Sequence, residues 1–185
     1  MELREFVEPS DIEPTKRASA GQLAADLLTW SRLGVALALP LVLWSASLTP
    51  AVFLVSWAWI SDLLDGRLAR GSGREGRMGR WDLAVDTAVG GGIAIGLAGM
   101  GEVPAWFAAS SILLFGGWWL LMGKPAGSML LQLSGYVPLL RVLWNEQPPW
   151  WWLPFATAAL TVMVDWRRLV EVNIPGFLQS FRPTR

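Results

Sequence analysis

Six apolar stretches, each about as long as a membrane-spanning helix, dominate this sequence of 185 residues. A bilayer core about 30 Å thick requires roughly 20 apolar residues per helix. Turn residues or charges separate the stretches, which lie near residues 24–44, 48–66, 82–100, 104–122, 127–145 and 149–167. Hydrophobic residues make up 53% of the chain and charged residues only 16%, which is too apolar for an ordinary soluble domain. The sequence therefore predicts an all-α integral membrane protein with six transmembrane helices.

The apolar stretches divide the chain into three parts. Residues 1–23 mix acidic residues with polar ones and lack an apolar run, so they do not form a cleavable signal peptide. We expect a cytoplasmic leader there that includes a juxtamembrane surface helix. Residues 24–168 form the six-helix transmembrane domain, and residues 169–185 are expected to form a cytoplasmic tail.

Basic residues concentrate in alternate connections between the predicted helices. They comprise Lys16, Arg17, Arg67, Arg70, Arg74, Arg77, Arg80, Lys124, Arg167, Arg168, Arg182 and Arg185. The opposite connections, around Ser47, Glu102 and Glu146, carry no Lys or Arg apart from Arg141 at a helix end. Because basic connections stay on the cytoplasmic side, we expect both termini in the cytoplasm and the protein in the cell inner membrane.

Composition also limits the chemistry. The 15 basic and 15 acidic residues cancel, so no overall field attracts nucleic acid. The chain has no cysteine and no histidine, which excludes disulfides, thiolate nucleophiles, imidazole bases and the usual zinc ligand sets. Acid–base chemistry must therefore depend on Asp or Glu.

The third apolar stretch is rich in glycine. Its glycines are Gly90, Gly91, Gly92, Gly96 and Gly99. Small residues at these spacings let neighbouring membrane helices approach closely, so we interpret them as a packing feature without chemistry.

Four aspartates lie between residues 61 and 87, where the second and third predicted helices meet the cytoplasmic side. Asp62 and Asp65 are three residues apart, and Asp82 and Asp86 are four apart, so each pair shares a helix face where like charges repel. A divalent cation relieves this repulsion, and carboxylate oxygens suit Mg²⁺ or Mn²⁺. The alternative is that the acids pair with the arginines of the same segment. We favour a carboxylate-held metal site at this membrane face.

The same segment resembles a known family signature. Asp62-x-x-Asp65-Gly66-x-x-Ala69-Arg70, followed by Asp82-x-x-x-Asp86, is similar to the motif of the CDP-alcohol phosphotransferases, membrane enzymes of phospholipid biosynthesis. The segment 27–33, LLTWSRL, resembles the start of the family's first transmembrane helix. The family has a glycine four residues before the third aspartate. Met78 occupies that position here, and Gly79 lies next to it.

The resemblance implies a function and a set of site residues. The family transfers a phosphatidyl-type group from a CDP-linked lipid, usually CDP-diacylglycerol, to a small hydroxylated acceptor and releases CMP. For this chain it implies two Mg²⁺ or Mn²⁺ ions near Asp62, Asp65, Asp82 and Asp86, with Asp86 as the general base. Gly66, Ala69, Arg70 and Gly79 would lie along the nucleotide. A homodimer among membrane lipids is also implied, and glycerol 3-phosphate is one candidate acceptor.

Several alternatives stay open from the sequence. A divalent-ion transporter or channel would also use aspartates at a membrane boundary, and an inactive family member would keep the motif. Lys124, Arg167 and Arg168 either bind a phosphorylated acceptor or, as we favour, only set the topology. Arg32, inside the first apolar stretch, either extends to lipid headgroups or faces the acids, and the sequence favours neither.

Overall fold

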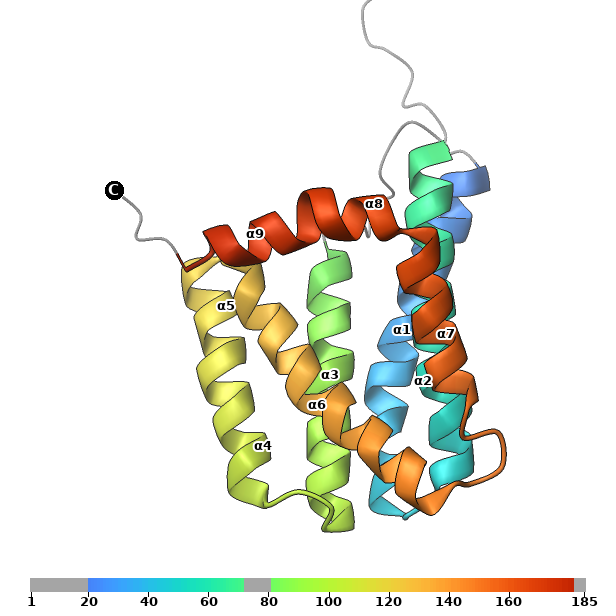
Figure 1. The fold of residues 1–185 in the computed structure, drawn as a ribbon, viewed down its shortest axis with the longest axis vertical. Helices are drawn as coiled ribbons and strands as arrows, with labels where there is room; N and C mark the ends of the chain where they lie inside the picture. The colour runs from blue at the N-terminus through green and yellow to red at the C-terminus, as the bar shows by residue number, and fades with distance from the viewer. Residues whose placement is uncertain (1–19, 72–80, 182–185) are drawn as a thin grey trace, which may run out of the picture.

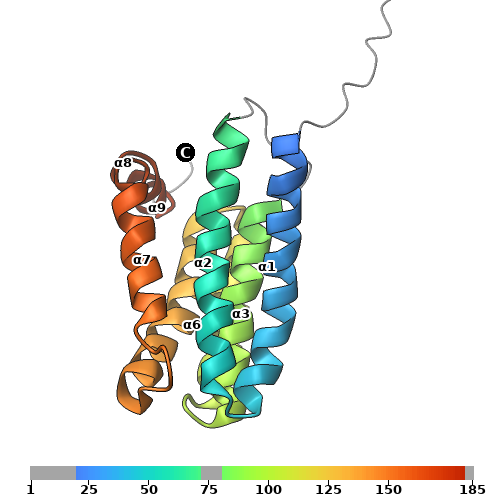
Figure 2. The ribbon, with the colours of Figure 1, turned by 90° about the vertical axis from the view of Figure 1, so that its right-hand side faces the viewer.

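The structure, a computed structural model, describes residues 20–71 and 81–181 (Figures 1 and 2). Within these residues it is all-α, as predicted; residues 1–19 of the expected leader 1–23 lie outside them, and residues 20–23 begin α1. Four long helices are α1 (Ala20–Trp44), α2 (Leu48–Gly71), α3 (Asp82–Met100) and α6 (Pro125–Glu146). A further continuous helical stretch consists of α4 (Ala105–Ser111), the π-helix η3 (Ile112–Gly116) and α5 (Gly117–Met122). In length and composition these form five candidate membrane spans.

The sixth predicted helix is shorter than the others. The tryptophan-rich turn before it ends at Trp152, and α7 then covers only Leu153–Val164. Asp165 follows with a non-helical backbone (φ −106°, ψ 24°), which ends the helix. Twelve residues of α-helix extend about 18 Å, less than the thickness of a bilayer core. The expected six helices are therefore five long spans and one short apolar helix.

The chain changes direction at Asp165 and crosses one end of the bundle as a second helical stretch (Figure 1). This stretch, named here the C-terminal helix, consists of α8 (Trp166–Arg168), the π-helix η4 (Leu169–Asn173) and α9 (Ile174–Gln179). The last residues of this stretch are held to the bundle, because Lys124 Nζ donates a hydrogen bond to the Ser180 carbonyl at 2.8 Å. Most of the segment expected as a tail thus packs against the bundle.

Glycine contacts bring α3 close to its neighbours. A Cβ atom on Gly92 would lie 2.7 Å from the Ala36 carbonyl of α1, and one on Gly96 would lie 2.7 Å from Leu43 Cβ. On the other side, a Cβ on Gly135 of α6 would lie 2.3 Å from the Gly90 carbonyl. The glycine-rich stretch is therefore a packing feature, as predicted. The buried core between α1, α2, α3 and α6 includes Leu39, Val55, Ile93 and Leu139.

The two ends of the bundle differ in the polar groups they hold. One end contains the four aspartates Asp62, Asp65, Asp82 and Asp86 and the C-terminal helix, and we call it the acid-cluster end. The opposite end, which we call the far end, contains the turns near residues 45–47, 101–104 and 147–152. Trp44, Trp106 and Trp144 lie at the far end and are more than half exposed. Exposed tryptophans at one level suit a membrane–water interface.

Candidate active site

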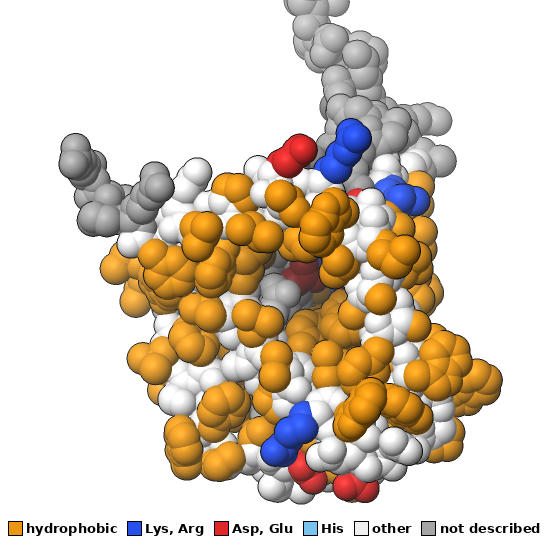
Figure 3. Space-filling view, in the orientation of Figure 1, with side chains coloured by type: hydrophobic (Ala, Val, Ile, Leu, Met, Phe, Trp, Pro, Cys, Tyr) orange, Lys and Arg blue, Asp and Glu red, His pale blue; other side chains and the backbone are white. Residues whose placement is uncertain are grey.

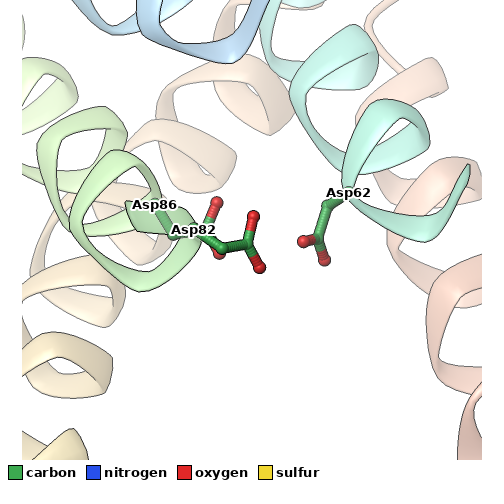
Figure 4. Close-up of side chains that lie close together, drawn as sticks. All are labelled: Asp62, Asp82 and Asp86. Atoms are coloured by element: carbon green, nitrogen blue, oxygen red, sulfur yellow. The ribbon is translucent and has the colours of Figure 1, made fainter. Parts of the chain in front are cut away.

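Two helices present carboxylates to each other at the acid-cluster end. Asp62 projects from α2, and Asp82 and Asp86 project from the first turns of α3, toward the same space (Figure 4). One carboxylate oxygen from each of these three residues lies within 4.8 Å of the other two. Asp82 is in the first turn of α3, where the unpaired backbone N–H groups favour negative charge. Three of the four predicted aspartates therefore converge from two helices onto one position.

Arg32 of α1 lies in the centre of the acids. Arg32 is fully buried, and its guanidinium forms ion pairs with all four aspartates. We call Asp62, Asp65, Asp82 and Asp86 the acid cluster. Nη1 is 2.9 Å from Asp62 Oδ1 and also contacts Asp86 Oδ1. Nη2 contacts Asp65 Oδ2 and Asp82 Oδ1. Of the two sequence alternatives for Arg32, the one in which it faces the acids is observed.

Asp65 has different surroundings from the other three acids. Its side chain is 8% exposed, whereas those of Asp62 and Asp82 are 42% and 37% exposed. Thr29 of α1 donates a hydrogen bond to Asp65 Oδ2 at 3.3 Å, and the same hydroxyl also contacts the Ala25 carbonyl. Asp65 thus links α1 to α2 and lies outside the group of three convergent carboxylates.

The donor set of the convergent group fits a divalent cation. Asp62, Asp82 and Asp86 offer only carboxylate oxygens, the ligands that Mg²⁺ and Mn²⁺ prefer. Four carboxylates face a single guanidinium, so the charge of Arg32 alone does not balance the cluster. The exposed sides of Asp62 and Asp82 leave the group accessible from one direction. These residues could therefore hold a metal ion.

The residues expected along the nucleotide are described in part. Gly66 follows Asp65 on α2, with intermediate burial. Ala69 and Arg70 lie in the last turn of α2, but their side chains are outside the described part of the structure, as is Gly79. Their role in nucleotide binding stays a prediction.

Of the three basic residues considered for binding an acceptor, Arg167 and Arg168 are adjacent and Lys124 lies apart from them. Arg168 lies close enough to Asp62 for their charges to interact. Lys124 instead contacts Ser180, which is 12 residues further along the C-terminal helix, or about 18 Å. A single phosphate does not reach both Lys124 and Arg168 in this arrangement.

An apolar pocket of about 370 Å³ opens between α6 and the C-terminal helix. Its lining consists of Trp59, Met129, Gln132, Leu133, Tyr136, Leu169, Asn173, Ile174 and Phe177. Figure 3 shows the surface hollowed beneath the C-terminal helix, with acidic side chains visible in the depression. Tyr136 lies near enough to Asp86 and Asp62 for its hydroxyl to interact with their charges. The pocket therefore extends from the side of the bundle toward the acid cluster.

Sequence reasoning missed Thr29 and left the direction of Arg32 open. Thr29 and Arg32 are three residues apart on an otherwise apolar helix, a spacing that places them on one face. That spacing indicated that Thr29 shares the direction of Arg32, whichever way Arg32 faces. Tyr136 gave no comparable signal, because a lone tyrosine in an apolar helix is common at helix interfaces.

A model of the CDP-alcohol phosphatidyltransferase family matches residues 22–166, which is more than half of the chain. The match includes α1, the acid cluster and all of α7, and it agrees with the resemblance noted in the aspartate motif. No curated protein and no solved structure matches the chain.

Proposed function

The chain belongs to the CDP-alcohol phosphatidyltransferase family, and on that premise we propose that it transfers a phosphatidyl-type group from CDP-diacylglycerol to a small hydroxylated acceptor. CMP is the leaving product. The observation that carries the proposal is the convergence of Asp62, Asp82 and Asp86 beside an apolar pocket that reaches the side of the bundle. A lipid-linked diphosphate requires both features at one place, because its headgroup is anionic and its tail is apolar.

In the proposed reaction Asp86 acts as the general base. Its carboxylate accepts the proton of the acceptor hydroxyl while the hydroxyl oxygen forms a bond to the phosphatidyl phosphorus. The bond from that phosphorus to the bridging oxygen of the diphosphate breaks, and CMP leaves with the electron pair. Two Mg²⁺ or Mn²⁺ ions held by Asp62, Asp82 and Asp86 would supply positive charge to the diphosphate and the leaving group.

The nucleotide and the acceptor are assigned by position on α2 and the C-terminal helix. Gly66, Ala69 and Arg70 continue α2 beyond Asp65, so we propose that they and Gly79 contact the CDP portion, with Arg70 on a phosphate. Arg168 lies near Asp62 and is the residue we propose for a phosphorylated acceptor such as glycerol 3-phosphate. Lys124 is instead assigned to holding the C-terminal helix.

We further propose a homodimer in the cell inner membrane with the acid-cluster end in the cytoplasm. Lys124, Arg167 and Arg168 lie at that end, and so does the last turn of α2, which leads into the arginine-rich segment 72–80 of the sequence. CMP and a water-soluble acceptor would then exchange directly with the cytoplasm.

The divalent-ion transporter is the less favoured alternative. A permeation path requires polar groups along the membrane depth, often at the midplane. The described aspartates that converge here gather at one end of the bundle, and a buried arginine lies among them. A positive charge in this position opposes the passage of a cation.

The test is release of CMP from CDP-diacylglycerol by the purified protein in detergent, with Mg²⁺ or Mn²⁺ and a panel of acceptors. Asp86→Asn should lower the rate by about 100-fold or more, because it removes the base. Glu102→Gln, at the far end, is the matched control and should keep the wild-type rate. Metal-dependent CMP release in the wild type that Asp86→Asn retains would contradict the role of Asp86. Failure of the folded protein to bind CDP-diacylglycerol would favour the transporter, and donor binding without CMP release for any acceptor would favour an inactive member.

A further inference from the structure

Arg32 contacts the same carboxylates that converge as a metal-ligand group. Its two terminal nitrogens share their contacts among four aspartates, and three of these are Asp62, Asp82 and Asp86. A divalent cation bound here would therefore compete with the guanidinium for the same carboxylate oxygens. Two positive groups at such short range also repel each other.

One of the hydrogen-bond donors of the Arg32 guanidinium has no partner in the described part of the structure. Arg32 Nε is buried and has no hydrogen-bond partner among the described residues. An arginine built only to brace a helix pair typically satisfies its planar set of donors, often by a two-fold contact with one carboxylate. Here the aspartates hold both terminal nitrogens, and the remaining N–H is unpaired. The position of the group thus depends on the charges of the acid cluster.

The four contacts of Arg32 also differ in depth. Asp65 is almost buried and accepts a hydrogen bond from Thr29, which fixes it between α1 and α2. Asp62 and Asp82 are partly exposed and accessible to an ion from outside the bundle. The guanidinium can therefore keep its contact with Asp65 while it gives up the more exposed ones.

We propose that Arg32 is a built-in competitor of the divalent cation. It neutralises the acid cluster and holds α1, α2 and α3 together when metal is scarce, and it lowers the affinity of the cluster for metal. Metal binding requires the guanidinium to give up its contacts with Asp62, Asp82 and Asp86 and to keep the one with Asp65. The inference rests on the proposed function only in taking the acid cluster as the metal site.

The test compares Mn²⁺ binding and thermal unfolding of the wild-type protein and Arg32→Gln in detergent. Free Mn²⁺ is measured by electron paramagnetic resonance during a titration. Arg32→Gln should bind Mn²⁺ roughly tenfold more tightly, because the competing cation is gone. With a chelator its Tm should fall by roughly 10 °C, because the buried Asp65 and the partly buried Asp86 lose their positive partner. Saturating Mn²⁺ should narrow that difference.

Two further variants keep the result interpretable. Arg141→Gln is the matched control, since Arg141 is an exposed arginine of α6 at the far end, 3.6 Å from Glu102. It should leave the Mn²⁺ affinity and the Tm unchanged. Arg32→Lys keeps a positive charge on a shorter side chain, which competes with the metal less effectively. Its Mn²⁺ affinity should therefore lie between those of the wild type and Arg32→Gln. If Arg32→Gln does not fold, the affinity of Arg32→Lys decides.

An unchanged or weaker Mn²⁺ affinity in both Arg32 variants would overturn the proposal. So would a loss of Tm of equal size with chelator and with saturating Mn²⁺, which would assign Arg32 a purely structural role. A wild-type protein that binds no Mn²⁺ overturns it too. Because Mn²⁺ binding is measured without substrate, absence of CMP release would contradict the proposed transferase and leave this result intact.

Discussion

Asp62 and Asp65 are one helical turn apart, and their different surroundings predict different effects when each is neutralised. Asp62→Asn should weaken Mn²⁺ binding and change the free energy of unfolding by less than about 1 kcal/mol, because its side chain is partly exposed. Asp65→Asn should cost about 1–3 kcal/mol, because a buried carboxylate that accepts from both Thr29 and Arg32 is lost. Thermal unfolding and Mn²⁺ titration of the two variants measure both effects. Equal destabilisation by the two variants would contradict this division of roles.

Residue spacing explains how much of the site could be predicted. The intervals Asp62–Asp65 and Asp82–Asp86 fix which side chains share a face within each helix, so the convergent carboxylates were expected. Spacing does not give the rotation of α1 about its axis, on which the direction of Arg32 depends. That rotation is set by contacts such as Ala36 with Gly92 on α3. The sequence therefore left Arg32 undecided until the packing of α1 was known.

At the scale of helices, close backbone contact predicts a matched pair of glycine substitutions. Gly135→Ala should destabilise the protein by about 1–3 kcal/mol, because its Cβ would lie 2.3 Å from the Gly90 carbonyl and α6 must move from α3. Gly34→Ala, on an α1 surface with nothing within 4 Å of the added Cβ, should be neutral or stabilising by up to about 1 kcal/mol. The measurement is Tm in detergent. A Gly135→Ala variant as stable as the wild type would contradict the close packing of α3 and α6.

The pocket beneath the C-terminal helix yields a second prediction at this scale. Asn173→Trp should fill the pocket and raise the KM for CDP-diacylglycerol about tenfold, equivalent to about 1.4 kcal/mol, with a smaller change in kcat. Val172→Trp is the control, because Val172 is 60% exposed and does not line the pocket. KM is measured as the mole fraction of donor in mixed micelles. Equal KM values for Asn173→Trp and Val172→Trp would contradict binding of the donor in this pocket.

The helices themselves were predictable to different degrees. Five long spans follow from apolar length, which is a property of the sequence alone. The stop at Asp165 and the turn into the C-terminal helix were not predicted, because the apolar stretch to residue 167 continues through Asp165. What ends α7 is a change of environment at the membrane boundary, where Asp165, Arg167 and Arg168 favour water. The C-terminal helix then stays on the bundle through contacts such as Trp118 with Phe181, whose ring centroids are 5.3 Å apart.

For the whole molecule, the distribution of basic residues predicts which way the bundle crosses the membrane. Arg167 and Arg168 lie at the acid-cluster end, whereas the far end holds Glu102 and Glu146 with Arg141 beside Glu102. By the positive-inside rule we therefore predict that the acid-cluster end faces the cytoplasm. The proposed transfer to a water-soluble acceptor in the cytoplasm requires this orientation, because the carboxylates must be accessible to that acceptor.

Single-cysteine labelling measures this orientation cleanly, since the chain has no cysteine of its own. Gln179→Cys places a thiol on the C-terminal helix, and Asn145→Cys places one at the far end; both positions are exposed. In sealed right-side-out vesicles, a membrane-impermeant maleimide should label Asn145→Cys at once and Gln179→Cys only after detergent is added. Labelling of Gln179→Cys in sealed vesicles, with Asn145→Cys protected, would invert the topology. It would also place Asp62, Asp82 and Asp86 on the side away from cytoplasmic substrates, so the orientation and the proposed reaction are tested together.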